Sequence, residues 1–170
     1  SDMKKILYFA LCLGLFVGTS CIDNREDGLM PSKVYLVKSG VQEYRATADQ
    51  TTASASAWAT KSGLLASSCE VVYSIDPQYL ADYNEANGTS FEMLPESCYK
   101  LVQTKFSLTA DDINAPFAVE YDPSAIYRLC GAYNVPEKYA LPIRIDVTGL
   151  EVLENKVQVL MTFNISAPTE

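Results

Sequence analysis

A strict alternation of side chains from Thr51 to Thr60 limits what this part of the chain can form. From Ala53 to Ala59 every second residue is alanine, and the positions between the alanines carry hydroxyl groups or the indole of Trp58. Successive side chains point to opposite faces only in a β-strand, whereas a helix repeats about every 3.6 residues. The segment is therefore predicted to be a strand, although alanine by itself favours helices. Its alanines should face the core, and Trp58 should face outward.

Other short segments are also rich in strand-forming residues and are separated by turn residues. The predicted strands are Lys33–Lys38, Val41–Ala48, Glu70–Ile75, Tyr99–Val102, Lys105–Leu108, Phe117–Tyr121, Tyr139–Ile145 and Val157–Ile165. Ser39-Gly40 predicts a hairpin-like break between the first two. Asp76-Pro77 and Asn87-Gly88 predict the start and the left-handed end of a short helix. This spacing predicts an all-β sandwich of about seven to nine strands, with one or two short helices in its connections.

The chain contains no histidine, which narrows the chemistry it can perform. Ser-His-Asp catalysis, Cys-His catalysis and histidine-containing zinc sites all need an imidazole ring. With 21 acidic and 13 basic residues, the net charge of −8 argues against binding to nucleic acid. Asp111 and Asp112 provide too few oxygen ligands for calcium, so we interpret them as a solvated turn. We expect no cofactor, no metal and no catalytic residue.

The first 20 residues have the features of a bacterial export signal. The first two are interpreted as a cloning remnant, and Lys4-Lys5 then precede an apolar run, Ile6–Val17. This run is too short for a transmembrane helix, which needs about 20 residues. Gly18-Thr19-Ser20 precede Cys21, which resembles a lipobox, in which the cysteine is acylated and becomes the first residue of the mature protein. We therefore expect residues 1–20 to be removed and Cys21 to carry a lipid.

Residues 21–32 are polar and are predicted to form a tether. They include three acidic residues, Asp23, Glu26 and Asp27. This stretch resembles the signal with which Bacteroidetes move lipoproteins to the outer face of the outer membrane, and an ordinary solvated linker is the alternative. On the first interpretation the protein is held at the outer membrane by its lipid alone and faces the cell exterior. Residues 33–170 would then form the folded domain.

Three further cysteines, Cys69, Cys98 and Cys130, follow the lipid-bearing position. An odd number cannot all pair, and three different single disulfides are open to them. Each lies in an apolar stretch, where a free cysteine packs as a small hydrophobic residue. We therefore favour buried free thiols.

Four motifs follow one another along the chain. They are Val71-Val72-Tyr73-Ser74-Ile75-Asp76, Tyr83-Asn84-Glu85-Ala86-Asn87-Gly88-Thr89, Met93-Leu94-Pro95-Glu96-Ser97-Cys98-Tyr99-Lys100-Leu101 and Lys138-Tyr139-Ala140-Leu141-Pro142-Ile143-Arg144-Ile145. Together they resemble the domain of unknown function at the N-terminus of many Bacteroidetes surface lipoproteins encoded in polysaccharide-utilisation loci. The resemblance covers roughly residues 33–165 and implies an immunoglobulin-like β-sandwich on a lipid anchor. Members commonly precede a glycan-binding module or a glycoside hydrolase, whereas this sequence ends at Glu170, as expected of a single-domain member or of part of a longer protein.

The motif residues also have structural explanations, which we favour. Tyr83 and Asn84 are expected to close the predicted helix, and Leu94-Pro95 to end a connection. In Tyr139–Ile145 every second residue should face the core. Pro142 within this run predicts an edge strand or a bulge, because proline cannot donate a backbone hydrogen bond.

Aromatic side chains are the remaining candidates for ligand recognition. Sugar rings have apolar faces that stack on tyrosine and tryptophan. Trp58 is a candidate because it is expected to face outward. Tyr127 and Tyr133 are candidates because they flank residues 128–132, which we interpret as an irregular connection suited to a binding loop. Tyrosine is equally common in strands and cores, so a packing role is the alternative for each.

Three classes of function follow from these features. The favoured class is a cell-surface lipoprotein that binds glycans or assists other surface proteins in capturing them. The alternative is a structural or interaction subunit, such as a pilin-like or adhesin-like protein that adds a strand to a partner, with Tyr44-Arg45-Ala46 as a candidate processing site. An enzyme is not expected, since a small sandwich leaves little room for the two opposed carboxylates of a glycosidase.

Overall fold

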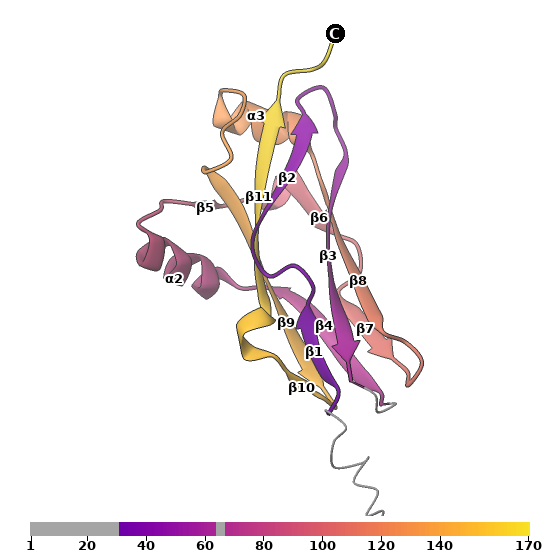
Figure 1. Cartoon of the computed structure of the whole chain (residues 1–170). Helices are drawn as coiled ribbons and strands as arrows, with labels where there is room; N and C mark the ends of the chain where they lie inside the picture. Colours follow the sequence, from indigo (N-terminus) through magenta and orange to yellow (C-terminus); the bar gives the residue numbers. More distant parts are fainter. Residues whose placement is uncertain (1–30, 64–66) are drawn as a thin grey trace, which may run out of the picture. The chain divides into compact units, whose positions relative to one another are not determined.

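The structure is a computed structural model that describes residues 31–63 and 67–170 (Figure 1). The predicted signal segment, Cys21, and the acidic residues Asp23, Glu26 and Asp27 lie outside the described residues. Within them, eleven strands form two sheets, with two α-helices and two short 3-10 helices in the connections. The prediction of an all-β sandwich is confirmed.

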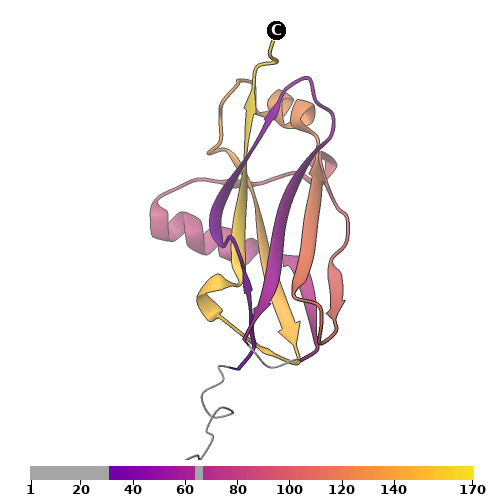
Figure 2. The ribbon, with the colours of Figure 1, turned by 45° about the vertical axis from the view of Figure 1, so that its right-hand side comes forward.

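The two sheets lie face to face, and both views show their strands running along the length of the sandwich (Figures 1 and 2). Sheet A has the order β10-β1-β3-β8-β6, and sheet B has the order β2-β11-β9-β4-β7 with β5 added beside β9. Sheet A consists of β1 (Lys33–Leu36), β3 (Ala53–Ser62), β6 (Tyr99–Leu101), β8 (Asn114–Tyr121) and β10 (Glu151–Val152). Sheet B consists of β2 (Gly40–Thr47), β4 (Cys69–Ile75), β5 (Glu92–Met93), β7 (Lys105–Leu108), β9 (Tyr139–Thr148) and β11 (Gln158–Ser166). Two strands of only two residues, β5 and β10, account for the excess over the predicted seven to nine.

The alternating segment forms β3, and its two faces are as predicted. Ala55, Ala57 and Ala59 are buried in the core, while Trp58 is half-buried on the opposite face. Small residues on the inner face of β3 leave room for larger rings from neighbouring strands. Tyr73 of sheet B uses this room, since its ring stacks on Phe117 of sheet A with centroids 4.4 Å apart.

The chain changes sheets at Ser39-Gly40, so the predicted hairpin-like break is wrong. β1 pairs with β3 in sheet A, whereas β2 pairs in parallel with β11 in sheet B. Gly40 has a φ of 76°, a left-handed conformation that glycine adopts without strain. After the chain has left sheet A, the Tyr44 hydroxyl on β2 donates a 2.6 Å hydrogen bond back to the carbonyl of Ser56 on β3 in sheet A. This bond ties the two sheets together beside the crossing.

Pro142 lies in a central strand, so the prediction of an edge strand or a bulge is also wrong. β9 lies between β11 and β4, and Pro142 is buried. Along one side of β9, β5 pairs with its first residues and β4 with its later ones, and Pro142 lies between these two partners. Its carbonyl accepts a hydrogen bond from the N–H of Asp76, where β4 ends. The missing N–H of proline is tolerated because, on the side of β9 where β5 and β4 pair, no continuous partner strand runs past Pro142.

Both α-helices begin with Asp-Pro and end before a glycine. In α2 (Pro77–Asn87), as predicted, the Asp76 side chain accepts a hydrogen bond from the N–H of Tyr79, and Gly88 follows in a left-handed conformation. The same signals bound α3 (Pro123–Cys130), which begins after Asp122 and ends at Gly131. The prediction that residues 128–132 form an irregular connection is therefore wrong up to Cys130. Two 3-10 helices cover Glu96–Cys98 and Glu154–Lys156.

The three cysteines of the described residues are free thiols, in agreement with the favoured interpretation. Cys69 and Cys98 are buried, and Cys130 is half-buried. Burial raises the pKa of each thiol. A raised pKa keeps a thiol protonated and weakly nucleophilic, which suits a packing role.

Candidate functional site

Tyr127 and Tyr133 meet at the α3 end of the sandwich. Tyr127 lies in the last turns of α3, which the Asp122 carboxylate caps by accepting hydrogen bonds from the Ser124 hydroxyl and the Ala125 N–H. These bonds, that of Ser124 first, lower the pKa of Asp122. The capped helix thereby gives Tyr127 a fixed place on the protein.

The two tyrosine rings are stacked, with centroids 4.5 Å apart and planes within 12° of each other. Two backbone hydrogen bonds hold the segment after α3 so that Tyr133 lies against Tyr127. Gly131 donates to the carbonyl of Tyr127 at 2.9 Å, and Asn134, with a φ of 56°, donates to the carbonyl of Ile165 on β11 at 2.8 Å. A hydrogen bond with the Tyr127 hydroxyl is the largest of the causes that raise the pKa of Tyr133.

The two rings differ in exposure. Tyr127 is half-buried and packs against the core, whereas Tyr133 is 42% exposed. One face of the Tyr133 ring lies against Tyr127. The pair is thus a flat aromatic surface on a rigid support, which is the geometry on which a sugar ring can stack.

Trp58, the third predicted contact, lies elsewhere. It is on the outer face of sheet A, in register with Pro116 on β8, and its carbonyl accepts a hydrogen bond from the N–H of Val37. Val37 and Pro116 are both exposed, so Trp58 has apolar neighbours at the surface. Among the described residues, no contact joins Trp58 to the tyrosine pair, and the three residues do not form one site.

The adjacent carboxylates Asp111 and Asp112 belong to a turn, as interpreted. Asp112 accepts hydrogen bonds of 2.8 Å from both the N–H and the hydroxyl of Thr109, and these bonds lower its pKa. Lys61 also reaches this turn and donates to the carbonyl of Thr109 at 2.7 Å. In the described part of the chain, no group of three or more Asp, Glu or Cys side chains is placed to hold a metal ion.

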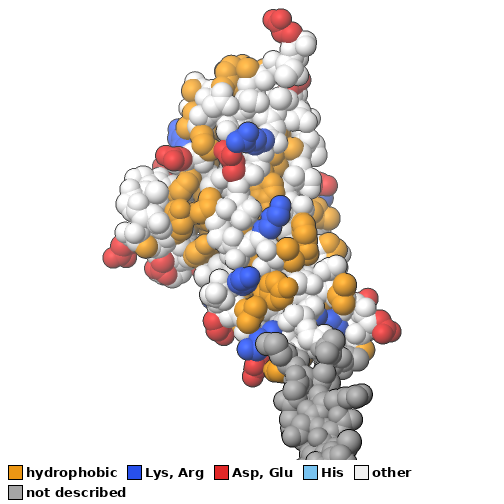
Figure 3. All heavy atoms as spheres, viewed as in Figure 1, with side chains coloured by type: hydrophobic (Ala, Val, Ile, Leu, Met, Phe, Trp, Pro, Cys, Tyr) orange, Lys and Arg blue, Asp and Glu red, His pale blue; other side chains and the backbone are white. Residues whose placement is uncertain are grey.

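A groove beside α2 was missed by the sequence analysis. It has a volume of about 250 Å³, and Figure 3 shows hydrophobic side chains gathered beside α2 on this face. Its apolar lining is Val41, Tyr83, Phe91 and Pro136, and its polar lining is Glu43, Thr89, Glu137 and Thr162. These residues come from β2, the end of α2, the segment after it, the segment before β9, and β11. In the sequence these residues fall in four separate stretches, 41–43, 83–91, 136–137 and Thr162, and no local pattern relates them. Tyr83 was interpreted only as part of the helix end.

A larger cavity of about 500 Å³ lies at the other end of β9, between β9, β10 and the turn that joins them. Its lining contains charged residues of both signs, including Arg144, Asp146 and Glu154, and no aromatic residue. It therefore lacks the stacking surface that the α2 groove and the tyrosine pair provide. No helix within the described residues is long and apolar enough to cross a membrane.

The model of a family of N-terminal domains matches residues 30–151, which is more than half of the chain. The chain belongs to this family. The matched residues include all four sequence motifs. The predicted membership of a family of N-terminal domains of unknown function from Bacteroidetes is confirmed. No curated protein matches the chain at a significant level.

Several solved structures from Bacteroides share the fold. A candidate carbohydrate-binding protein from Bacteroides ovatus has a TM-score of 0.60 and 23% identity over 81% of this chain and 38% of its own. A two-domain protein of unknown function from Bacteroides fragilis has a TM-score of 0.55 and 14% identity, covering 81% and 46%. EndoBT-3987 from Bacteroides thetaiotamicron, solved with a Man5GlcNAc product, has a TM-score of 0.51 and 20% identity, covering 75% and 28%.

At these identities the structural likeness shows a shared fold. The chain spans less than half of the length of each of these three structures.

Proposed function

We propose that this protein is a glycan-binding accessory module held at the cell surface by a lipid. The observation that carries the proposal is the Tyr127–Tyr133 stack, which holds an exposed tyrosine ring on a rigid support. A sugar presents axial C–H groups to such a ring, and the loss of conformational entropy on binding is small because the ring is already held in place.

The family relationship supports a role in glycan capture. One structure of the same fold is a candidate carbohydrate-binding protein, and another contains a Man5GlcNAc product. Both are longer chains, so a domain of this fold can occur as one part of a longer protein. An accessory binding role fits this arrangement, since a weak site gains avidity from a linked second site.

The proposed anchoring fits the position of the tyrosine pair. If Cys21 carries a lipid and residues 21–32 are a tether, the membrane attachment leads into β1. In Figures 1 and 2, β1 begins at the end of the sandwich opposite α3. The Tyr133 ring would then lie at the end of the domain that faces away from the membrane, where an extracellular polysaccharide can reach it.

Affinity electrophoresis in gels that contain one polysaccharide each tests the proposal. We expect at least one glycan to retard the protein. Tyr133→Ala should weaken this retardation roughly 2- to 12-fold, because one aromatic stack contributes about 0.5–1.5 kcal/mol. Leu129→Ala is the matched control, since Leu129 is exposed to nearly the same degree at the same end of α3. Equal retardation of wild type and Tyr133→Ala, or no retardation by any glycan, would contradict the proposal.

The outer face of sheet A favours a second candidate, an interaction subunit. Trp58, Val37 and Val102 place apolar groups on this face or beside it, and Val102 is 55% exposed. Apolar patches of this kind are used in protein contacts. Sedimentation of the purified protein tests self-association through this face. A dimer that Trp58→Glu dissociates, in a protein that no glycan retards, would favour this candidate over the first.

A further inference from the structure

The α2 groove lies on the outer face of sheet B, and its lining includes neither Tyr127 nor Tyr133. Odd-numbered residues of β2 and even-numbered residues of β11 share this face, because Glu43 is in register with Thr162. Helix α2 covers the neighbouring part of the face, where Leu80 packs on Leu160 and Ala140. The groove is the space left between this covered part and the edge strand β2.

Asn84 gives the groove a fixed wall. Its side-chain oxygen accepts hydrogen bonds from the Thr89 hydroxyl at 2.8 Å and from the Phe91 N–H at 3.0 Å, and its side-chain nitrogen donates to the Phe91 carbonyl at 3.0 Å. The ring of Phe91 lies 6.1 Å from that of Tyr83. Two aromatic rings and a threonine are thereby held in one arrangement before any ligand binds.

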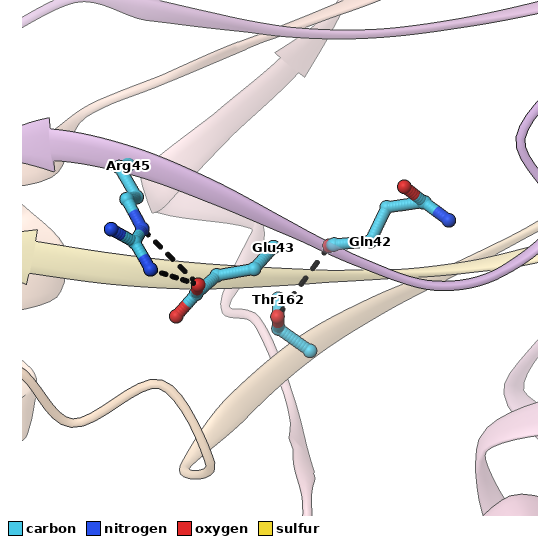
Figure 4. A network of polar contacts seen from close by, with 4 residues as sticks. All are labelled: Gln42, Glu43, Arg45 and Thr162. Carbon is cyan, nitrogen blue, oxygen red and sulfur yellow. Dashed lines mark hydrogen bonds and ion pairs between the residues drawn. The ribbon is translucent and has the colours of Figure 1, made fainter.

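The polar side of the groove contains both acceptors and a donor. Arg45 donates to Oε2 of Glu43 through Nε at 3.2 Å and Nη2 at 3.0 Å, as Figure 4 shows. Among the described residues, Oε1 of Glu43 has no partner and can accept from a ligand. Thr162, only 3% exposed, makes a long 3.5 Å bond to the carbonyl of Gln42, so its hydroxyl can be drawn toward a better partner.

We infer that the α2 groove binds a single uncharged sugar ring. The ring's apolar face would lie against Val41, Tyr83 and Phe91, and its hydroxyls would donate to Glu43 and Glu137. At about 250 Å³ the groove is smaller than the roughly 300–1,000 Å³ of drug-sized pockets, which suits one ring better than an extended chain.

Other ligand classes fit this lining less well. An anion would face two carboxylates, and a purely apolar ligand would cover polar groups without giving them partners. A cation would have to approach the Arg45 guanidinium beside Glu43. A hydroxyl both donates and accepts, so a sugar satisfies this mixture of groups. The inference deepens the proposed glycan role and adds a second site for it.

Titration of the ¹⁵N-labelled full chain with glucose, galactose, mannose and N-acetylglucosamine, followed by amide chemical shifts, tests the inference. One of these sugars should shift the amides of Thr89, Phe91 and Thr162 with a dissociation constant on the order of millimolar. Glu137→Gln should weaken binding about tenfold, because it removes a charged acceptor. Glu85→Gln, an exposed carboxylate on α2 outside the groove, is the matched control and should bind as wild type does.

The shifted residues separate this inference from the proposed function. Shifts confined to Tyr133 and Asn134 would overturn the inference and leave the proposed function standing. Shifts confined to the groove would support the inference and contradict the role of the tyrosine pair. Lysine, used as a cationic probe, should have no effect, and a stronger response to lysine than to every sugar would overturn the inference. No shift with any of the sugars would overturn it as well.

Discussion

The hydroxyl of Tyr73 in sheet B accepts a 2.7 Å hydrogen bond from the backbone N–H of Ala59 in sheet A. The same hydroxyl donates to the carbonyl of Ala115, the register partner of Ala59 on β8. A side chain of one sheet therefore lies between two paired strands of the other. Both residues are fully buried, so the hydroxyl gives each backbone group a partner where water does not reach it.

Replacing this tyrosine tests how much the bridge contributes to stability. Tyr73→Phe should lower the free energy of unfolding by about 1–3 kcal/mol, because it removes two buried hydrogen bonds, one from the Ala59 N–H and one to the Ala115 carbonyl. Urea denaturation measures the change. Tyr35→Phe is the control, since the Tyr35 hydroxyl has no hydrogen bond among the described residues, and it should change stability by less than about 0.5 kcal/mol. Equal effects of the two substitutions would show that the strands close up without the hydroxyl.

Two buried tyrosines, Tyr73 and Tyr121, and the half-buried Tyr44 predict unfolding at alkaline pH. Burial raises the pKa of Tyr44, Tyr73 and Tyr121 from 10.0 to about 12. Between these values the unfolded chain loses phenolic protons that the folded chain retains, so stability falls as the pH rises from 10 to 12. Absorbance at the tyrosinate band should increase in two steps, with the second step coinciding with loss of β-sheet circular dichroism. A single step at pH 10 without unfolding would contradict this prediction.

The positions of the helices and strands could be predicted from the sequence better than the pairing of the strands. Local patterns identified β3 from its alternation and α2 from Asp76-Pro77 and Gly88, because those signals act within a few residues. The same Asp-Pro and glycine signals surround α3, yet its eight residues are too few for a helical period to stand out. A search for paired cap signals, without a periodicity requirement, would have found it.

Sheet pairing depends on contacts that are distant in sequence. β2 pairs with β11, and the hydrogen bond from Thr162 to Gln42 joins residues 120 positions apart. The position of Pro142 was misjudged for the same reason, since only the assembled sheet shows the change of partner from β5 to β4. Of the candidate ligand contacts, Tyr127 and Tyr133 come together because they are close in sequence, whereas the α2 groove combines segments that no local pattern connects.

The lipid anchor stays a prediction and can be tested directly. Cys21→Ala, expressed in a Bacteroidetes host, should accumulate as unprocessed precursor and should no longer partition into the detergent phase, because the acylated thiol is lost. Cys130→Ala is the control and should be processed and partition normally. Unchanged partitioning of Cys21→Ala would show that the lipobox interpretation is wrong.

The acidic tether predicts where the lipoprotein is delivered. Replacing Asp23, Glu26 and Asp27 by alanine should leave acylation intact and should protect the protein from protease added to whole cells. Replacing the neighbouring Asn24 by alanine is the control, because it leaves the charge of the tether unchanged. Digestion of the triple variant in intact cells would favour the alternative, an ordinary solvated linker.

Asn84 is predicted to support both the end of α2 and the wall of the groove. Asn84→Ala removes three side-chain hydrogen bonds to Thr89 and Phe91, and its backbone carbonyl must then hold the helix end alone. We expect a loss of about 1–3 kcal/mol in unfolding free energy. Asn87→Ala in the same helix is the matched control, since its side chain makes a single exposed bond to the Tyr83 carbonyl, and the expected loss is below about 1 kcal/mol.

If both variants unfold at the same urea concentration, the Asn84 side chain does not stabilise this wall. If instead Asn84→Ala alone is destabilised, its Thr89 and Phe91 amides should also exchange with solvent faster, because these are the groups that the side chain holds in place.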